Sequence, residues 1–340
     1  MDGNRPGPGP RNLITDVPGL RVGQAQDHAV RTGVTVILPD APAVAAADVR
    51  GGGPGTRETD ALAPENLVDT VDAVVLAGGS VYGLAAADGV TAWLGARGRG
   101  HAMAEGIPRS PIVPAAVLFD MANGGDKAWG EDPPHRALGR RAIEAAGLDF
   151  ALGTAGAGYG ALAGGLKGGT GSASVVTHDG YTVGAVVCVN SWGSVIAPGG
   201  RTFWAAPFEL DGEFGGLGSA GLRAGPDEWG SAKRPVETRN TTIACVATDA
   251  ILTPAQARRV AVMAQDGFAR AIRPVHAPFD GDVVFAISTG LRPLTDPPAY
   301  ALARLGALAA DCLARAVARG IFEAKPWPDA YVPCWRDLQS

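Results

Sequence analysis

The sequence predicts an α/β protein, and three observations support this prediction. Several short runs are apolar at consecutive positions, which is typical of strands whose two faces are both covered. Two later segments carry apolar residues at spacings of three and four, the period of an amphipathic helix. A glycine turn also joins one apolar run to a stretch of small residues. We therefore expect buried strands packed against helices.

Five strands are predicted from the apolar runs, which are rich in valine and alanine. Because their apolar residues do not alternate with polar ones, we expect other layers of the protein on both faces of most of them. These runs span residues 33–38, 73–77, 181–189, 242–248 and 283–288.

The two periodic segments predict packing helices. The first begins after Thr253, which can cap a helix, and has Pro254 at the first helical position, where proline is tolerated. The second spans residues 300–321 and repeats leucine and valine at the same helical spacing. We assign both helices to packing without a chemical role.

The glycine turn at Gly78 and Gly79 predicts a strand that leads directly into a helix of small residues. Free N–H groups at such a helix start can bind an anion or an oxyanion. The glycine clusters at 51–55 and 156–160 do not match GxGxxG, and the sequence has no P-loop motif. We therefore expect no nucleotide cofactor.

Composition limits the class of protein. The chain has 340 residues, of which 46% are hydrophobic, enough for one large core or two moderate ones. A net charge of -5 with scattered basic residues argues against nucleic acid as a partner. Residues 1–11 lack the apolar core of a signal peptide, and no run approaches the length of a membrane span. We expect a cytoplasmic protein, without a membrane partner, whose residues 1–11 form a disordered tail.

Metal binding and disulfides are not expected from the cysteine and histidine pattern. The four cysteines form no CxxC pair, and three of them lie inside apolar runs, as buried free thiols do. The histidines show no metal-ligand spacing, so we assign each to the surface or to a turn. They are His28, His101, His135, His178 and His276.

The junction between Asn240 and Thr241 is the strongest indication of chemistry. A polar stretch ends there, and an apolar strand begins with a hydroxyl residue. A chain cut before Thr241 would carry a hydroxyl and a free α-amine on one residue. Because an α-amine has a pKa of about 7.7 to 8, it can accept the hydroxyl proton near neutral pH and activate the nucleophile. The simpler alternative is that Thr241 only begins a strand, where threonine is common.

The segment before this junction favours the chemical interpretation. Residues 209–240 are rich in glycine and charge and have no helical or strand period. A connection of that length inside a compact domain is usually functional or disordered. We therefore predict a flexible linker at 208–240 that presents the bond to be cut. The cut would separate residues 12–240 from 241–340, both belonging to one domain.

Four other polar residues are candidates for the same site. Lys167 lies between glycine pairs, where the backbone can approach a substrate, and Asn190 ends a predicted strand, where an amide can stabilise an oxyanion. Asp280 and Asp282 flank a glycine before a strand, and alternation places them on one side of an extended chain. Such a pair can orient a hydroxyl and an amine. Each residue also has an alternative role on the surface or in a turn.

Several long motifs resemble the L-aminopeptidase/D-esterase family of N-terminal nucleophile hydrolases. The resemblance covers about residues 12–321, and Asn240-Thr241 with Asp280-Gly281-Asp282 is similar to the 6-aminohexanoate-oligomer endohydrolase branch. The motifs are residues 12–23, Arg50 to Asp60, Val81-Tyr82-Gly83-Leu84, Gly165-Leu166-Lys167-Gly168-Gly169 and the junction.

This resemblance implies a four-layer αββα sandwich that cuts itself into two fragments and assembles into a tetramer. It implies Thr241 as the nucleophile, supported by Lys167, Asp280 and Asp282. Asn190 matches the oxyanion-stabilising asparagine of the family, and Tyr82 matches a tyrosine that lines the substrate site. No cofactor or metal is implied. The family pattern of the aminopeptidase branch, Gly-Ser at the junction and Ser-x-Glu later, is absent.

The implied activity is hydrolysis of small linear oligoamides through an acyl-enzyme. Three alternatives remain open from the residues. An aminopeptidase or amidase on small natural peptides or β-peptides would use the same residues with a different pocket. An acyl transferase like ornithine acetyltransferase would pass the acyl group to an amine. A non-catalytic binding protein would leave the chain uncut.

Overall fold

The computed structural model describes residues 6–230, 232–233 and 240–338. Its centre consists of two sheets, and the first has five strands in the order β1-β2-β6-β7-β4. Most neighbours in it are antiparallel, but β6 and β7 run parallel. The strands are β1 (Leu20–Asp27), β2 (Thr32–Pro39), β4 (Thr56–Arg57), β6 (Val74–Ala77) and β7 (Ala115–Val117).

The second sheet has six strands in the order β10-β11-β12-β13-β3-β5. Strand β12 pairs antiparallel with β11 and parallel with β13, while β13 pairs antiparallel with β3. Its members are β3 (Ala43–Val49), β5 (Thr70–Val71), β10 (Gly169–Val176), β11 (Thr182–Asn190), β12 (Thr241–Ala250) and β13 (Val283–Arg292); β8 (Leu162–Ala163) and β9 (Leu166–Lys167) form a separate small hairpin.

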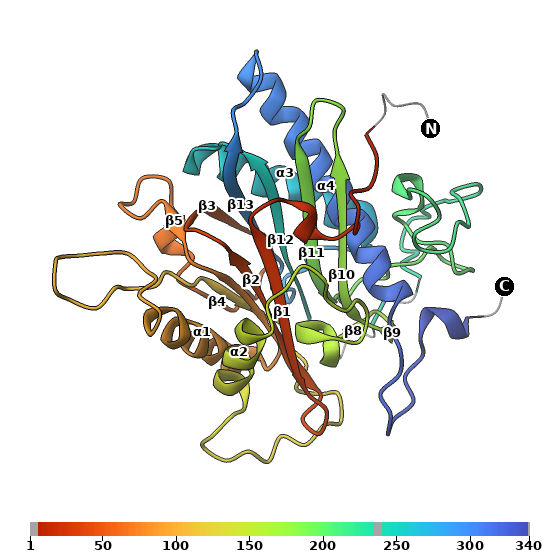
Figure 1. Cartoon of the computed structure of the whole chain (residues 1–340). Coiled ribbons are helices and arrows are strands. Elements are labelled where there is room, and N and C mark those ends of the chain that lie inside the picture. The colour runs from red at the N-terminus through yellow and green to blue at the C-terminus, as the bar shows by residue number, and fades with distance from the viewer. Residues whose placement is uncertain (1–5, 231, 234–239, 339–340) are drawn as a thin grey trace.

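Two pairs of helices cover the outer faces of the sheets (Figure 1). Helices α1 (Ala86–Gly95) and α2 (His135–Glu144) pack on the five-stranded sheet, and α3 (Pro254–Ala271) and α4 (Pro298–Phe322) pack on the six-stranded sheet. The start of α3 matches its predicted cap, because Thr253 Oγ accepts the N–H of Gln256 at 3.3 Å and Gln256 Oε1 accepts the N–H of Thr253 at 2.9 Å.

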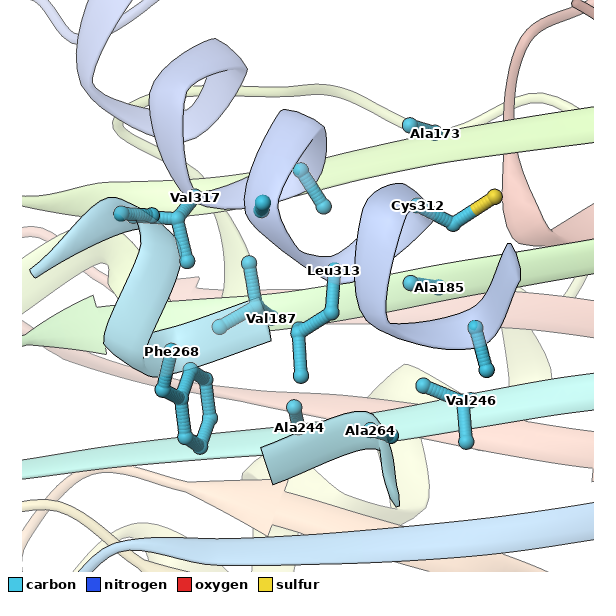
Figure 2. Packing of buried hydrophobic residues seen from close by; sticks show 14 of the residues in the cluster. Ala173, Ala185, Val187, Ala244, Val246, Ala264, Phe268, Cys312, Leu313 and Val317 are labelled. Atoms are coloured by element: carbon cyan, nitrogen blue, oxygen red, sulfur yellow. The ribbon is translucent and has the colours of Figure 1, made fainter. Parts of the chain in front are cut away.

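Three apolar layers hold the four structural layers together. Alternate residues of β11 and β12 point in opposite directions: Val187 and Ala244 pack under α3 and α4, while Cys188 and Ile243 pack between the sheets. Figure 2 shows the first of these layers, with Leu313 of α4 above the strands. A third layer joins α1 and α2 to the five-stranded sheet. The chain is therefore an αββα sandwich, as the resemblance implied.

The five predicted strands correspond to β2, β6, β11, β12 and β13, and the two predicted helices to α3 and α4. Residues of β2, β6, β11 and β12 are buried along their whole length, which confirms the expectation of layers on both faces. Gly79, with a φ of +86°, ends the strand β6, and a 3-10 helix (Ser80–Ala85) leads from it into α1.

The predicted linker is packed near its start, around Glu213 and Phe214, contrary to the expectation of flexibility throughout. Phe214 is buried in the layer under α4, and the Glu213 carboxylate pairs with the guanidinium groups of Arg315 and Arg319. Residues 231 and 234–239 of this segment, including Arg239 of the junction, lie outside the described residues. The sequence of residues 209–216 alone does not indicate the arginine partners of Glu213, which lie about a hundred positions away.

The N-terminal segment is also partly packed. Gly7 pairs with Val176 of β10 through two backbone hydrogen bonds, and the N–H of Gly9 donates to Ser174 Oγ at 3.1 Å. The described part of the tail therefore extends the edge of the six-stranded sheet, and residues 1–5 lie outside the described residues. Among the described helices, none is long and apolar enough to cross a membrane.

Candidate active site

The junction residues lie at one end of the six-stranded sheet. Thr241 is the first residue of β12 and is paired directly with Asn190, the last residue of β11. Both side chains follow the alternation of Ile243 and Cys188, which places them on the face between the two sheets. The segment that ends at Asp282 leads into β13 on the other side of β12. Sheet register therefore brings together three regions that are far apart in sequence.

The peptide bond between Asn240 and Thr241 is buried and held at both of its residues. Thr241 Oγ donates a hydrogen bond to the carbonyl oxygen of Asn240, the residue directly before it. The N–H of Gly281 donates to the same oxygen at 3.1 Å. Lys233 Nζ donates to Asn240 Oδ1 at 2.5 Å. A hydroxyl and a backbone donor thus meet at one carbonyl, the arrangement that acyl transfer requires.

The glycine-rich loop at residues 50–55 packs against the segment that carries the carboxylates. The N–H of Gly53 donates to the Asp280 carbonyl at 2.7 Å. A Cβ at Gly51 would lie 2.3 Å from the Asp280 carbonyl oxygen, and a Cβ at Gly52 would lie 2.3 Å from the Pro278 carbonyl oxygen. Only glycine permits this approach. The loop therefore fixes the position of Gly281 and its N–H.

Asp280 and Asp282 are both buried beside the junction but have different partners. Asp282 accepts hydrogen bonds from the backbone N–H of Thr242 at 2.8 Å and from the ring of His276 at 2.8 Å. Asp280 accepts from the N–H of Ala277 at 3.0 Å. Burial and, after it, the neighbouring Asp282 carboxylate raise the pKa of Asp280 to about 7. Asp280 can therefore exchange a proton near neutral pH.

Asn190 is fixed in place by backbone groups on both sides of its amide. Its Oδ1 accepts the N–H of Leu162 at 2.9 Å, and its Nδ2 donates to the carbonyl of Phe119 at 2.9 Å. An amide nitrogen has two N–H donors, and the second has no partner among the described residues. The side chain thus offers a preorganised donor opposite Thr241, and its role in stabilising an oxyanion stays a prediction.

Lys167 is fully buried and donates to three backbone carbonyls, those of Gly158, Ala161 and Gly168. An ammonium group has three N–H donors, so these carbonyls use them all. Burial lowers the pKa of Lys167 to about 7. The structure places Lys167 behind the loop that holds Asn190, and the described residues to which its ammonium group donates do not include Thr241.

Two cavities flank the Asn240–Thr241 bond. One, of about 510 Å³, is lined by Asn190, Asn240 and Lys233 among others. The second, of about 670 Å³, is lined by Thr241 and Asn240 together with mostly apolar side chains. Tyr82 borders neither cavity, because its ring packs edge-on against Trp129 at 5.5 Å between ring centres and is 47% exposed. The apolar residues of the second cavity include Pro54, Val81, Leu84, Val117, Leu118, Phe119 and Phe279.

Three contacts of the site could not be inferred from the sequence patterns. His276 was assigned to the surface or a turn, yet its ring binds Asp282. Gly281 looked like a spacer between two carboxylates, yet its N–H binds the Asn240 carbonyl. Lys233 lay in a linker with no distinguishing pattern. The alternation of Asp280 and Asp282 around a glycine was the only available signal for Gly281.

Two face-to-face sheets between helical layers, with a hydroxyl residue starting a central strand, define the fold of the N-terminal nucleophile hydrolases. Residues 12–330 match peptidase family S58, and the chain belongs to this family. It is an amide-bond hydrolase by that membership.

Proteins of similar sequence support this assignment. The chain is 46% identical to an uncharacterized aminopeptidase of Mycobacterium bovis, over 96% of this chain and 98% of the relative. It is 30% identical to the 6-aminohexanoate-oligomer endohydrolase of Agromyces sp., over 86% of this chain and 79% of the relative. Both branches considered from the sequence are thus represented among the relatives.

Solved structures share the fold. A Burkholderia sp. beta-aminopeptidase superimposes with a TM-score of 0.70 at 24% identity, covering 93% of this chain and 88% of the other. The L-aminopeptidase D-Ala-esterase/amidase of Ochrobactrum anthropi, described as a variant of the Ntn hydrolase fold, gives 0.70 at 23% identity, with coverages of 95% and 89%.

Proposed function

We propose that the chain cuts itself between Asn240 and Thr241 and then hydrolyses amide bonds of small linear oligoamides, such as 6-aminohexanoate oligomers. The new N-terminal Thr241 would be the nucleophile. The observation that carries this proposal is the carbonyl of Asn240, which accepts hydrogen bonds from Thr241 Oγ and from the N–H of Gly281. The hydroxyl and an oxyanion donor already meet at the bond to be cut.

Self-cleavage proceeds in two steps. Thr241 Oγ attacks the Asn240 carbonyl carbon, the carbon–nitrogen bond breaks, and the acyl group moves from nitrogen to oxygen as the nitrogen gains the hydroxyl proton. Water then hydrolyses the ester and leaves an Asn240 carboxylate and a free Thr241 amine. The N–H of Gly281 stabilises the oxyanion during the attack.

The same atoms serve substrate hydrolysis. Thr241 Oγ attacks a substrate amide carbonyl, and the Thr241 α-amine accepts the hydroxyl proton and passes it to the leaving amine. The Asn190 amide and the Gly281 N–H stabilise the oxyanion, and removal of one such donor typically costs about 2.7 to 4 kcal/mol. Asp280 and Asp282 orient the nucleophilic residue, and Lys167 supports the Asn190 side through the loop it holds.

Substrate preference follows from the two cavities. The cavity beside Thr241 has no charged side chain among the described residues that line it, and its apolar side chains fit a methylene chain. A peptide or β-peptide aminopeptidase is a second candidate, because the Mycobacterium bovis relative at 46% identity is named an aminopeptidase. A panel of 6-aminohexanoate oligomers, α-peptides and β-peptides, with free and acetylated amino termini, separates the two activities.

Intact-mass measurement of the purified protein tests the self-cleavage. Two fragments of roughly 24 and 10 kDa are expected, in proportion to 240 and 100 residues of a 34.5 kDa chain. Thr241→Ala should stay whole and show no hydrolysis. Cleavage of that variant at the same bond would mean that an outside protease makes the cut. Assembly into a tetramer and location in the cytoplasm remain predictions.

A further inference from the structure

Lys233 is a cation of the linker, and within the described part of the chain its side chain reaches the junction. Its backbone N–H donates to the Trp192 carbonyl at 3.0 Å, which anchors this residue just beyond the end of β11. Its Nζ donates to Asn240 Oδ1 at 2.5 Å, and its half-buried side chain lines the cavity that also contains Asn190. The side chain therefore reaches the acyl side of the Asn240–Thr241 bond.

Among the described residues, the charge of Lys233 lies near two buried carboxyl groups. Asn240 forms a parallel bridge with Asp280, and Asp282 follows two residues later. The charged or titratable groups grouped there are Asp280 and Asp282, with His276 bound to Asp282. The positive charge of Lys233 lowers the pKa of Asp280 and so opposes the effect of burial. Before the cut, Thr241 has no α-amine to provide a second cation.

We propose that Lys233 is a positioning residue for self-cleavage, which orients the Asn240 side chain and supplies positive charge beside the Asp280 carboxylate until the Thr241 amine forms. This inference rests on the proposed self-cleavage. The cut creates an ammonium at Thr241, next to the same carboxylates, while Lys233 stays on the other fragment. One cation thus replaces the other beside these carboxylates.

Lys233→Met tests this role because it keeps the length of the side chain and removes the charge. The chain is purified before cleavage is complete, and mass spectrometry then follows the fraction of intact chain over time. We expect self-cleavage to slow at least about tenfold, the scale of one lost hydrogen bond to a charged group. Lys233→Arg should restore most of the rate. Arg223→Met, which removes an exposed cation from the same linker, should cleave like the wild type.

Two further measurements separate positioning from a structural effect. Lys233→Gln, a second neutral substitution, should slow self-cleavage as much as Lys233→Met does. Asn240→Ala should also cleave slowly, and adding Lys233→Met to it should cause little further loss, because the two residues act through one contact. Thermal unfolding of each uncut variant checks that folding is intact.

The outcomes distinguish the inference from the function on which it rests. A wild-type chain that stays whole, or a Thr241→Ala chain that is cut, overturns the proposed self-cleavage itself. Wild-type cleavage with an equally fast Lys233→Met variant overturns only the role of Lys233. Failure of Lys233→Arg to restore the rate shows that charge is not the cause.

Discussion

Among the described residues, two buried carboxyl groups have a pKa raised to about 6 or 7, and they lie at the ends of different sheets. Asp280 precedes β13 beside the Asn240–Thr241 bond, and its pKa is raised to about 7. Asp120 follows β7 in the five-stranded sheet, and burial raises its pKa to about 6. Both are 2% exposed. Burial alone therefore does not distinguish a reactive carboxyl group from a structural one.

The surroundings of the two groups differ. Asp120 Oδ1 accepts the N–H of Gly79 at 2.7 Å, and a Cβ at Gly78 would lie 2.1 Å from Asp120 Oδ2. Behind it, His135 contacts Thr32, and burial lowers the pKa of His135 to about 4. These groups join β2, β7 and α2, with close packing around them. Although Asp120 lines the same cavity as Asn190, it has no hydroxyl–carbonyl pair beside it like that of Thr241 and Asn240.

The comparison teaches that geometry, and not a shifted pKa, marks the reactive cluster. Beside Asp280, a hydroxyl and a backbone N–H both donate to one carbonyl oxygen, that of Asn240. At Asp120 a turn and a helix start are held together by a buried acid. The predictions below test this division, beginning with the largest expected effect.

Gly281→Ala should slow self-cleavage by about 10² to 10³, the scale of losing one oxyanion donor. A Cβ at Gly281 would lie 2.7 Å from Thr241 Oγ and 2.8 Å from the Gly53 carbonyl oxygen, so the hydroxyl and the donor must both shift. The measurement is the rate of cleavage by mass spectrometry. Gly200→Ala is the control, because its Cβ would meet nothing within 4 Å. Normal cleavage of Gly281→Ala would remove this N–H from the mechanism.

Asp280→Asn should lower kcat/KM for amide hydrolysis by about 10² or more, the effect of a positioned proton-transfer or orienting group. Asp120→Asn, the matched substitution in the other cluster, should change kcat/KM by no more than about twofold. Both variants are assayed per cut chain after circular dichroism has verified folding. A similar decrease of kcat/KM in the two variants would contradict the proposed difference between the two clusters.

The pH dependence of hydrolysis should show a rising limb. The Thr241 α-amine must be neutral to accept a proton. We therefore expect kcat/KM to rise with pH along a limb whose midpoint lies near or below about 7.7 to 8. Desolvation in the site lowers the pKa of the amine, whereas the nearby carboxylates raise it. Selective acetylation of the new amino terminus should abolish activity. Full activity of the acetylated enzyme, or a flat profile from pH 5 to 9, would leave Thr241 without this base.

The smallest expected effect is on stability at Asp120. Its pKa in the folded chain is about 6, above the usual 3.8. As the pH rises, the unfolded chain therefore loses this proton before the folded chain does. Raising the pH from about 4 to 6 therefore lowers the free energy of unfolding, and Asp120→Asn should remove about 1 to 3 kcal/mol of this decrease. Urea unfolding in an uncut Thr241→Ala background measures it. An unchanged pH slope would contradict the buried, protonated Asp120.

The sequence patterns located the most apolar strands, two amphipathic helices and the small-residue helix after Gly79, and missed several strands made of small or alternating residues. Strand β10 was not predicted, because its residues Gly169–Val176 are small where α4 crosses closely: a Cβ at Gly171 would lie 1.8 Å from the Ala316 carbonyl oxygen. Likewise, Phe214 gave no local sign that it would be buried. Such features depend on partners far away in sequence, which local periodicity cannot reveal.

Several predicted site residues lie together at the junction, whereas Tyr82 borders neither cavity and the contacts between site residues were not predicted. Thr241 and Asn190 were chosen as strand ends, and sheet register then paired them. Lys167 was expected near the nucleophile, yet its ammonium group is occupied by three backbone carbonyls. The partnership of His276 with Asp282 required a turn that no spacing rule describes. Residue types therefore indicated the chemistry, whereas the hydrogen-bond assignments needed the fold.

The strand order of the six-stranded sheet has a consequence for the proposed cut. Strands β12 and β13, which follow residue 240, lie between β11 and β3, which precede it. The two fragments are therefore interleaved, and neither can leave without breaking ladders on both sides. Separation would require global unfolding, and reassembly would become a bimolecular event that depends on concentration. The mature enzyme should therefore be kinetically stable: it stays active because it unfolds slowly, and not because it refolds readily. Its working lifetime is then set by the rate of unfolding.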